Sequence, residues 1–173
     1  MKRVLVAGVG NVFLGDDGFG VEVAGRLKEV SLPAGVEVGD FGVAGVHLAY
    51  QMVEGYDAVV LIDAAPRGGR PGDLYVIEPD GAGPGGEQDG DGAMDTHGMH
   101  PEAVLRLVRI LGGGPERVVV VGCEPSWVDE GMGLSQPVGD CVEPAVAAVR
   151  GILEEMCGSG GDNGKRRQRC YGR

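Results

Sequence analysis

Two adjacent carboxylates, Asp16 and Asp17, stand in a glycine-rich stretch near the start of the chain, residues 8–20. An apolar run precedes this stretch and apolar residues at helical spacing follow it, which is typical of an α/β active-site loop between a strand and a helix. A phosphate-binding loop needs free amides and positive potential, and position 13 is Phe where the G-x-G-x-x-G pattern needs its third glycine. The stretch therefore predicts a cation site, with capping of the next helix by Asp16 or Asp17 as the alternative.

A third carboxylate, Asp63, ends the most continuous apolar run of the chain, residues 58–63. The run is rich in β-branched residues, which is typical of a strand buried on both faces of a parallel sheet. Open α/β sheets bind ligands at the carboxyl ends of their strands, so the position of Asp63 indicates a site. The alternative is an aspartate that only caps a loop at the end of the strand.

The histidines are the remaining candidates for metal binding or proton transfer. His97 and His100 lie between a long glycine- and acid-rich segment, residues 79–92, and a helix predicted to begin at Pro101. We expect the long segment to be a mobile surface loop. Two histidines three residues apart favour a metal site, for which one of them suffices. The third histidine, His47, opens another predicted helix, and we expect it to lie at the surface or to cap the helix rather than to act in catalysis.

The polar residues converge if the chain folds as a doubly wound sheet. The first and third strands of such a sheet are neighbours at its switch point, which brings Asp17 and Asp63 to one crevice and leaves His97 free to close it. Two carboxylates and an imidazole bind a divalent transition metal and leave coordination positions open. The same three side chains also suit acid–base chemistry without a metal, and their spacing does not decide between the two readings.

Alternating strand and helix patterns predict one α/β domain over residues 1–157. The fourth strand alternates apolar and polar residues and follows the third too closely for a helical crossover, so we expect it to be antiparallel. We expect residues 158–173, which are glycine-rich and then basic, to be disordered. The predicted strands cover residues 2–7, 36–38, 58–63, 72–78 and 118–122, and the predicted helices cover residues 19–31, 46–54, a segment from Pro101 and residues 138–156.

The charge of the chain limits its partners. The formal net charge is −11, and residues 1–158 hold ten basic and 25 acidic residues, a net charge of −15. Such a body does not favour nucleic acid or an anionic membrane as a partner, and no stretch is long and apolar enough to span a bilayer. The four cysteines lack C-x-x-C spacing, so we expect reduced thiols in a cytoplasmic protein.

Taken together and in this order, the motifs resemble the hydrogenase maturation proteases, endopeptidases that trim the C-terminus of the large subunit of nickel–iron hydrogenases. The similarity covers about residues 2–155. The motifs are Gly8-Val9-Gly10-Asn11, Asp16-Asp17-Gly18-x-Gly20, Leu61-Ile62-Asp63-Ala64, Thr96-His97-x-Met99-x-Pro101, Gly122-x-Glu124-Pro125 and Gly133-Leu134-Ser135. The resemblance implies a three-layer α/β/α fold of the phosphorylase/hydrolase-like kind. Its five-stranded mixed sheet has the order 2-1-3-5-4, with strand four antiparallel.

The resemblance also implies the roles of single residues. Asp17, Asp63 and His97 fall on the metal-binding and catalytic positions of the family, and Asp16 supports the loop. Glutamate is common in the family where this chain has Asp17. The metal is nickel, which the hydrogenase precursor supplies and which the protease recognises before it cleaves.

The segment of residues 40–45 matches a family segment proposed to contact the substrate, which makes Asp40 and Gly42 candidate substrate-binding residues. Phe41 and Val43 stand where glycine and threonine are usual in the family. The implied partner is the large-subunit precursor, and we expect the chain to act as a monomer. Two other functions remain open: a nickel-dependent chaperone that holds the precursor without cleaving it, and a cofactor-binding α/β domain.

Overall fold

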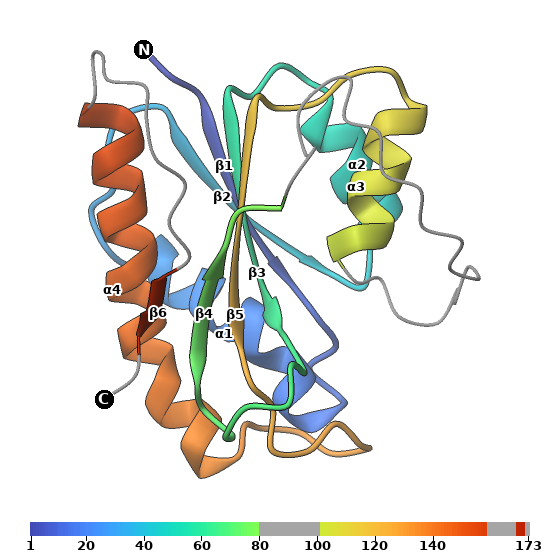
Figure 1. Ribbon diagram of the computed structural model, residues 1–173, viewed down its shortest axis with the longest axis vertical. Helices are drawn as coiled ribbons and strands as arrows, with labels where there is room; N and C mark the ends of the chain where they lie inside the picture. Colours follow the sequence, from blue (N-terminus) through green and yellow to red (C-terminus); the bar gives the residue numbers. More distant parts are fainter. Residues whose placement is uncertain (80–100, 159–168, 172–173) are drawn as a thin grey trace.

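A computed structural model describes residues 1–79, 101–158 and 169–171 (Figure 1). His97, His100 and most of the long segment that was expected to be mobile lie outside the described residues. The strands are β1 (Val4–Val9), β2 (Val36–Gly42), β3 (Ala58–Ala64), β4 (Leu74–Ile77), β5 (Arg117–Cys123) and β6 (Arg169–Tyr171). The helices are the short 3-10 helix η1 (Gly15–Gly18), α1 (Phe19–Lys28), α2 (Gly45–Met52), α3 (Pro101–Ile110) and α4 (Gln136–Gly158).

The strands form one mixed sheet in the order β2-β1-β3-β5-β4-β6. β1 pairs in parallel with β2 and β3, and β3 pairs in parallel with β5, whereas β4 runs antiparallel to β5. The predicted order 2-1-3-5-4, with an antiparallel fourth strand, is confirmed. β1 and β3 are neighbours, so the carboxyl ends of both strands lie at the same edge of the sheet.

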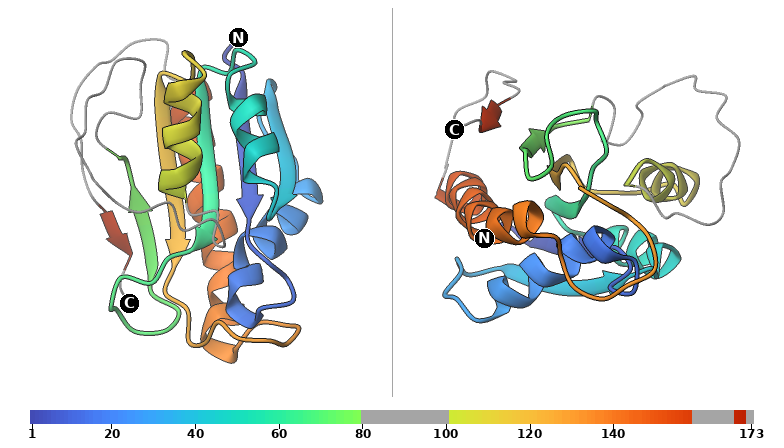
Figure 2. Two further views of the ribbon diagram at one scale, coloured as in Figure 1. Left: turned by 90° about the vertical axis from the view of Figure 1, so that its right-hand side faces the viewer. Right: turned by 90° about the horizontal axis from the view of Figure 1, so that it is seen from below.

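Two pairs of helices cover the two faces of the sheet and make three layers (Figures 1 and 2). α1 and α4 pack on one face, where Phe19, Leu27 and Leu153 are fully buried. α2 and α3 pack on the other face, where Leu48 and Met52 are fully buried. Every residue of β1 and β3 is buried, as their continuous apolar sequences predict for central strands.

β2 is longer than its predicted range of residues 36–38 and continues to Gly42. Its second half contains glycine and aspartate, which have low strand propensity, but its backbone pairs with β1 up to Val9 opposite Gly42. The register shifts by one residue between Gly8 and Val9. Asp40, which was expected in a loop, therefore lies near the carboxyl end of a strand.

The sixth strand was not predicted. Arg169–Tyr171 pairs antiparallel with β4, inside the segment that was expected to be disordered. Three residues in a glycine-rich and basic segment are too short to show strand alternation. Residues 159–168 and 172–173 lie outside the described residues, so disorder of the rest of this segment stays a prediction. None of the helices in the described part of the chain combines the length and the apolar character that are needed to cross a bilayer.

Candidate functional site

The loop after β1 lies tightly against the carboxyl ends of β1 and β3. Gly20, in the first turn of α1, makes this approach possible: a Cβ atom at this position would overlap the carbonyl oxygens of Ile62 and Val9. Only glycine lets the first turn of the helix come so near to both strands. The short helix η1, which carries Asp16 and Asp17, is thereby held over the end of the sheet.

Gly10 lies against the backbone of Asp17 and close to the side chain of Asp63, the two residues that were expected to converge. Its φ of 126° is in the region that favours glycine, and a Cβ atom there would overlap the carbonyl oxygen of Asp17. The same Cβ position is 3.7 Å from Oδ1 of Asp63. The side chain of Asp17 turns back to the loop, where Oδ2 accepts the Asn11 N–H at 2.7 Å. The structure thus brings Asp17 and Asp63 to one end of the sheet.

The carboxyl group of Asp63 has an unusual environment. The residue is 5% exposed, and burial together with the charge of Asp17 raises the pKa of Asp63 to about 8. A hydrogen bond from the Ala64 N–H opposes this increase but does not cancel it. A carboxyl group with so high a pKa beside a second carboxylate is suited to take up a proton near neutral pH or to receive a divalent cation.

Asp16 is fully buried and holds the loop together. Its two carboxylate oxygens accept four hydrogen bonds from the segment between β5 and α4: the N–H groups of Ser126, Trp127 and Ser135, and the Ser135 hydroxyl, at 2.6–3.1 Å. This agrees with the expected supporting role of Asp16. In the described part of the chain, neither η1 nor α1 has a side-chain cap, so the alternative reading of Asp16 and Asp17 as helix caps is wrong.

Glu124, which directly follows β5, is a buried acid at the same end of the sheet, and no functional role was predicted for it. Its carboxylate accepts the N–H groups of Arg67 and Gly68 at 2.8 and 3.2 Å, and the Tyr75 hydroxyl at 2.8 Å. Burial alone would raise the pKa of Glu124, but these hydrogen bonds outweigh it and hold the pKa below its usual value. Glu124 is therefore a charged anchor for the turn after β3. The short motif around it was the only sequence signal.

The two candidate substrate-binding residues lie on the other side of the β1 loop. The Gly42 N–H donates to Oδ1 of Asp40 at 2.9 Å, and the Gly42 carbonyl accepts the Gly10 N–H at 2.9 Å. Asp40 is exposed. Through Gly10, the end of β2 is thus joined directly to the loop that carries Asp17.

One of the three histidines, His47, lies within the described residues. His47 is exposed at the start of α2, as expected, and its ring forms a T-shaped pair with the ring of Phe41 at a centroid distance of 5.9 Å. His97, the expected third ligand, and His100 lie outside the described residues. Among the residues that the structure does describe, no three His, Cys, Asp or Glu side chains are grouped as a metal site, and Asp17 and Asp63 form only a pair.

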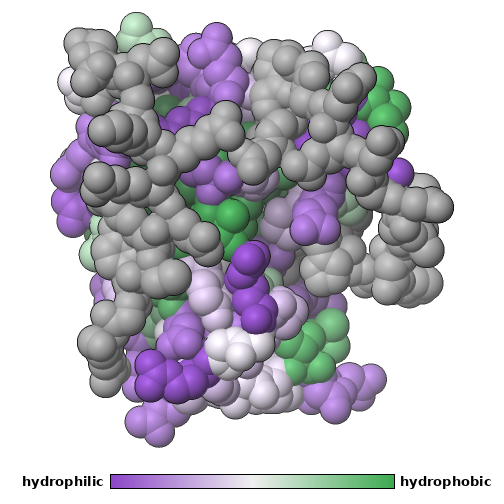
Figure 3. All heavy atoms as spheres, viewed as in Figure 1, coloured by the Kyte–Doolittle hydropathy of each residue, from purple (hydrophilic) through white to green (hydrophobic). Residues whose placement is uncertain are grey.

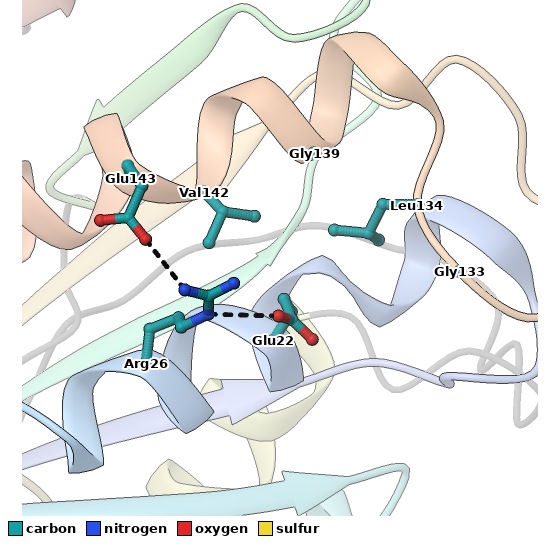
Figure 4. Close-up of a pocket in the computed structure, with 7 residues that line it drawn as sticks. All are labelled: Glu22, Arg26, Gly133, Leu134, Gly139, Val142 and Glu143. Carbon is teal, nitrogen blue, oxygen red and sulfur yellow. Dashed lines mark hydrogen bonds and ion pairs between the residues drawn. The ribbon is translucent and has the colours of Figure 1, made fainter.

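A shallow cavity of about 350 Å³ lies elsewhere, between α1 and α4 (Figure 4). Arg26 crosses it and pairs with Glu22 at 3.5 Å and with Glu143 at 3.4 Å. Neither Asp17 nor Asp63 is among the residues that line it. The buried carboxylates, rather than this cavity, mark the end of the sheet as the candidate site.

Comparison with known proteins identifies relatives of the chain. The family model described as "HycI: Hydrogenase maturation protease" matches residues 21–152. The hydrogenase expression/formation protein HupM of Azotobacter chroococcum is 32% identical over 155 residues, which are 88% of this chain and 72% of that protein. A putative hydrogenase maturation protease of Methanocaldococcus jannaschii is 31% identical over 158 residues, which are 89% of this chain and 98% of that protein.

Solved structures share this fold. The hydrogenase maturating endopeptidase HybD of Escherichia coli superposes with a TM-score of 0.73 and 29% identity, and the match covers 90% of this chain and 94% of HybD. A [NiFe] hydrogenase maturation protease HycI of Thermococcus kodakarensis superposes with a TM-score of 0.66 and 27% identity, over 88% of this chain and 93% of that one.

Proposed function

Because this chain belongs to the hydrogenase maturation protease family, we propose that it removes the C-terminal extension of a nickel–iron hydrogenase large-subunit precursor. The chain is a hydrogenase maturation endopeptidase. In our proposal the nickel ion is part of the substrate: it has already been inserted into the precursor, and its presence licenses cleavage.

The observation that supports this proposal best is the pairing of Asp17 with the buried Asp63. Burial and the neighbouring charge of Asp17 raise the pKa of Asp63 to about 8, so the metal-free site disfavours two carboxylates at once. A divalent cation brought by the substrate would stabilise both charges. The donor set of two carboxylate oxygens therefore suits a cation that arrives with the precursor, and His97 would complete it as an imidazole ligand.

The proposed roles follow the position of each residue. Asp17, Asp63 and His97 hold the nickel-bearing end of the precursor and orient the scissile peptide bond. A metal ion in such a place polarises a carbonyl group or activates a water molecule. Asp40 and Gly42, next to the Asp17 loop, contact the segment of the precursor that leads to the bond.

The test is a cleavage assay with purified protein and two forms of the cognate precursor, nickel-loaded and nickel-free. We expect cleavage of the loaded form only. Asp17→Asn, Asp63→Asn and His97→Ala should each reduce cleavage by at least about a hundredfold, because each removes one ligand that the other two cannot replace. Circular dichroism checks that the variants are folded.

Two controls make the assay specific. Asp140→Asn changes an exposed aspartate of α4 and should leave cleavage unchanged. His100→Ala should have a small effect, and loss of activity in that variant but not in His97→Ala would assign the role to the other histidine. A stable complex with the loaded precursor but no cleavage would instead support a nickel-dependent chaperone.

The proposal includes the setting of the reaction. We propose that cleavage takes place in the cytoplasm and that the protease acts on the precursor as a monomer. The thiols of Cys123, Cys141 and Cys157 are free, which is consistent with a reducing compartment.

A further inference from the structure

Large hydrophobic side chains are exposed on two loops at the candidate site. Val12 and Phe13 belong to the loop after β1, and Trp127, Val128 and Met132 belong to the loop between β5 and α4. Phe13 is 63% exposed and Met132 is 75% exposed. Figure 3 shows a hydrophobic cluster at the lower right, where Figure 1 draws the loop after β1. We call these five residues the apolar rim.

The backbone beneath the apolar rim is fixed. Leu14 and Gly131 form a parallel bridge, the Gly15 N–H donates to the Gly131 carbonyl at 2.8 Å, and the Gly131 N–H donates to the Phe13 carbonyl at 2.9 Å. The indole of Trp127 lies against Gly15 and Gly131, where a Cβ atom at either glycine would be 2.8 Å from the ring. Because the backbone of both loops is already held in place, a partner that binds here does not have to order the loops.

The apolar rim is continuous with the candidate active site. Asp16, which precedes Asp17 directly, accepts the N–H groups of Ser126 and Trp127. The buried carboxylate of Asp16 therefore joins the two loops of the rim directly beside Asp17, a proposed metal ligand. A macromolecular substrate at Asp17 would therefore have this surface beside it.

The charges around the apolar rim indicate which partner fits it. The two loops lie within residues 4–25 and 118–149, and neither stretch contains a lysine or an arginine. Asp129 and Glu130 are exposed between Val128 and Met132. A complementary surface would present apolar side chains flanked by basic ones. A second copy of this chain would bring the same carboxylates and a net charge of −11 to the contact, which opposes self-association.

We propose that the apolar rim is the docking surface for the folded body of the hydrogenase precursor, through an apolar patch flanked by lysine or arginine. The occupant is the substrate itself, so the inference rests on the proposed function and extends it from the chemistry to the recognition of the partner. The rim binds the precursor beside its nickel site while Asp17 and Asp63 face the ion. Aromatic and methionine side chains are common at the centre of such interfaces.

The test uses the full chain and the nickel-loaded cognate precursor. The variants are Phe13→Ser, Met132→Ser and the double variant, and the control is Ile110→Ser, which changes an equally exposed residue (75%) at the far end of α3. We expect the double variant to raise KM for the precursor by about tenfold or more with kcat nearly unchanged, because docking is lost and the ligands are not touched. The control should keep the parent KM, and thermal unfolding should show that all variants are folded.

The outcomes separate this inference from the proposed function. If the parent protein does not cleave the loaded precursor, the proposed function fails. If the parent cleaves it and the double variant cleaves with the parent KM, the docking role of the apolar rim is wrong and the function stands. A fall in kcat alone, or a parent dimer in size-exclusion chromatography that the double variant converts to a monomer, would also overturn the inference.

Discussion

At the scale of single residues, the buried acids at the end of the sheet divide into two kinds. Asp16 and Glu124 accept several hydrogen bonds each and serve as anchors for loops. Asp63 is stabilised, among the described residues, only by a hydrogen bond from the Ala64 N–H, and it lies close to the charge of Asp17. Carboxylates of the first kind stabilise the fold, whereas the second kind is costly to keep charged and is therefore expected where a cation is to be received.

Asp63→Asn should stabilise the metal-free protein relative to the parent, by an amount that increases with pH. The folded-state pKa of Asp63 is about 8, above its value in the unfolded chain, so the folded state holds a proton that the unfolded state releases from about pH 4 upward. The parent therefore loses stability between about pH 4 and pH 8, while the asparagine variant does not titrate. The difference in the free energy of unfolding between the variant and the parent should increase across this pH range to the order of a few kcal/mol.

Urea unfolding at several pH values in the presence of a chelator measures this difference. A constant offset from pH 4 to pH 8 would show that Asp63 is ionised normally. The Asp140→Asn variant, at an exposed site, serves as the reference and should keep the pH profile of the parent.

Asp16→Ala should destabilise the protein by about 3 kcal/mol or more, because it removes a fully buried carboxylate and leaves the N–H groups of Ser126 and Ser135 without their acceptor. Asp129→Ala is the matched control: its carboxylate accepts the N–H of the exposed Glu130 and its removal should change stability by less than about 0.5 kcal/mol. Hydrogen exchange distinguishes the mechanism, since the amides of Ser126 and Ser135 should lose protection in the Asp16 variant before the rest of the chain. Equal protection in both variants would contradict the anchoring role.

At the scale of elements, the position of α1 decides where the candidate ligands lie. The first turn of this helix contacts the ends of β1 and β3 through Gly20, and the loop before it passes over Gly10. A shift of α1 away from the sheet would move Asp17 and leave Asp63 in place. The distance between the two carboxylates is thus set by how closely one helix packs on two strands.

Two glycines of α1 allow a matched test. Gly20→Ala should destabilise the protein by about 2–3 kcal/mol, because its Cβ atom would overlap backbone carbonyl oxygens of Ile62 and Val9. Gly25→Ala, in the same helix, meets nothing within 4 Å and should stabilise it by about 0.5–1 kcal/mol, as alanine favours the helix. Thermal unfolding of the two variants beside the parent measures both effects, and a shift of the same sign in both would rule out the packing explanation.

The elements were predictable to the extent that they bury side chains in a periodic pattern. β3 and β5 are continuous apolar runs, and the alternation in β4 indicated its antiparallel direction. The second half of β2 and all of β6 were missed because their pairing depends on backbone hydrogen bonds, which leave no pattern in side chains.

The candidate site was predictable in part for the same reason. The meeting of Asp17 and Asp63 follows from the strand order, since both residues come at the ends of neighbouring parallel strands. The hydrogen bonds of Asp16 join it to residues 110 and 119 positions away, across loops that have no periodic pattern. A contact of that kind depends on tertiary structure, and only the acidic pair itself was visible in the sequence.

At the scale of the whole molecule, charge is distributed unevenly along the chain. Five of the 15 basic residues lie in the last nine positions, so the body that carries the site is more acidic than the net charge of −11 indicates. The two loops of the apolar rim contain no basic residue at all. Such a surface accelerates the encounter with a basic partner surface and slows the approach of acidic ones.

The rate of precursor cleavage should therefore depend on ionic strength. We expect kcat/KM for the nickel-loaded precursor to fall several-fold between low and high salt, because salt screens the attraction between the acidic body and the proposed basic patch of the precursor. The effect should appear in KM and in the association rate, with kcat unchanged.

Replacing both exposed rim acids, Asp129→Asn with Glu130→Gln, should flatten the salt dependence, whereas Asp140→Asn on α4 should not. Stopped-flow association and steady-state cleavage over a salt series measure both quantities. A kcat/KM that does not fall with salt would contradict electrostatic attraction, and a slope that the double variant leaves unchanged would show that acids outside the apolar rim attract the precursor.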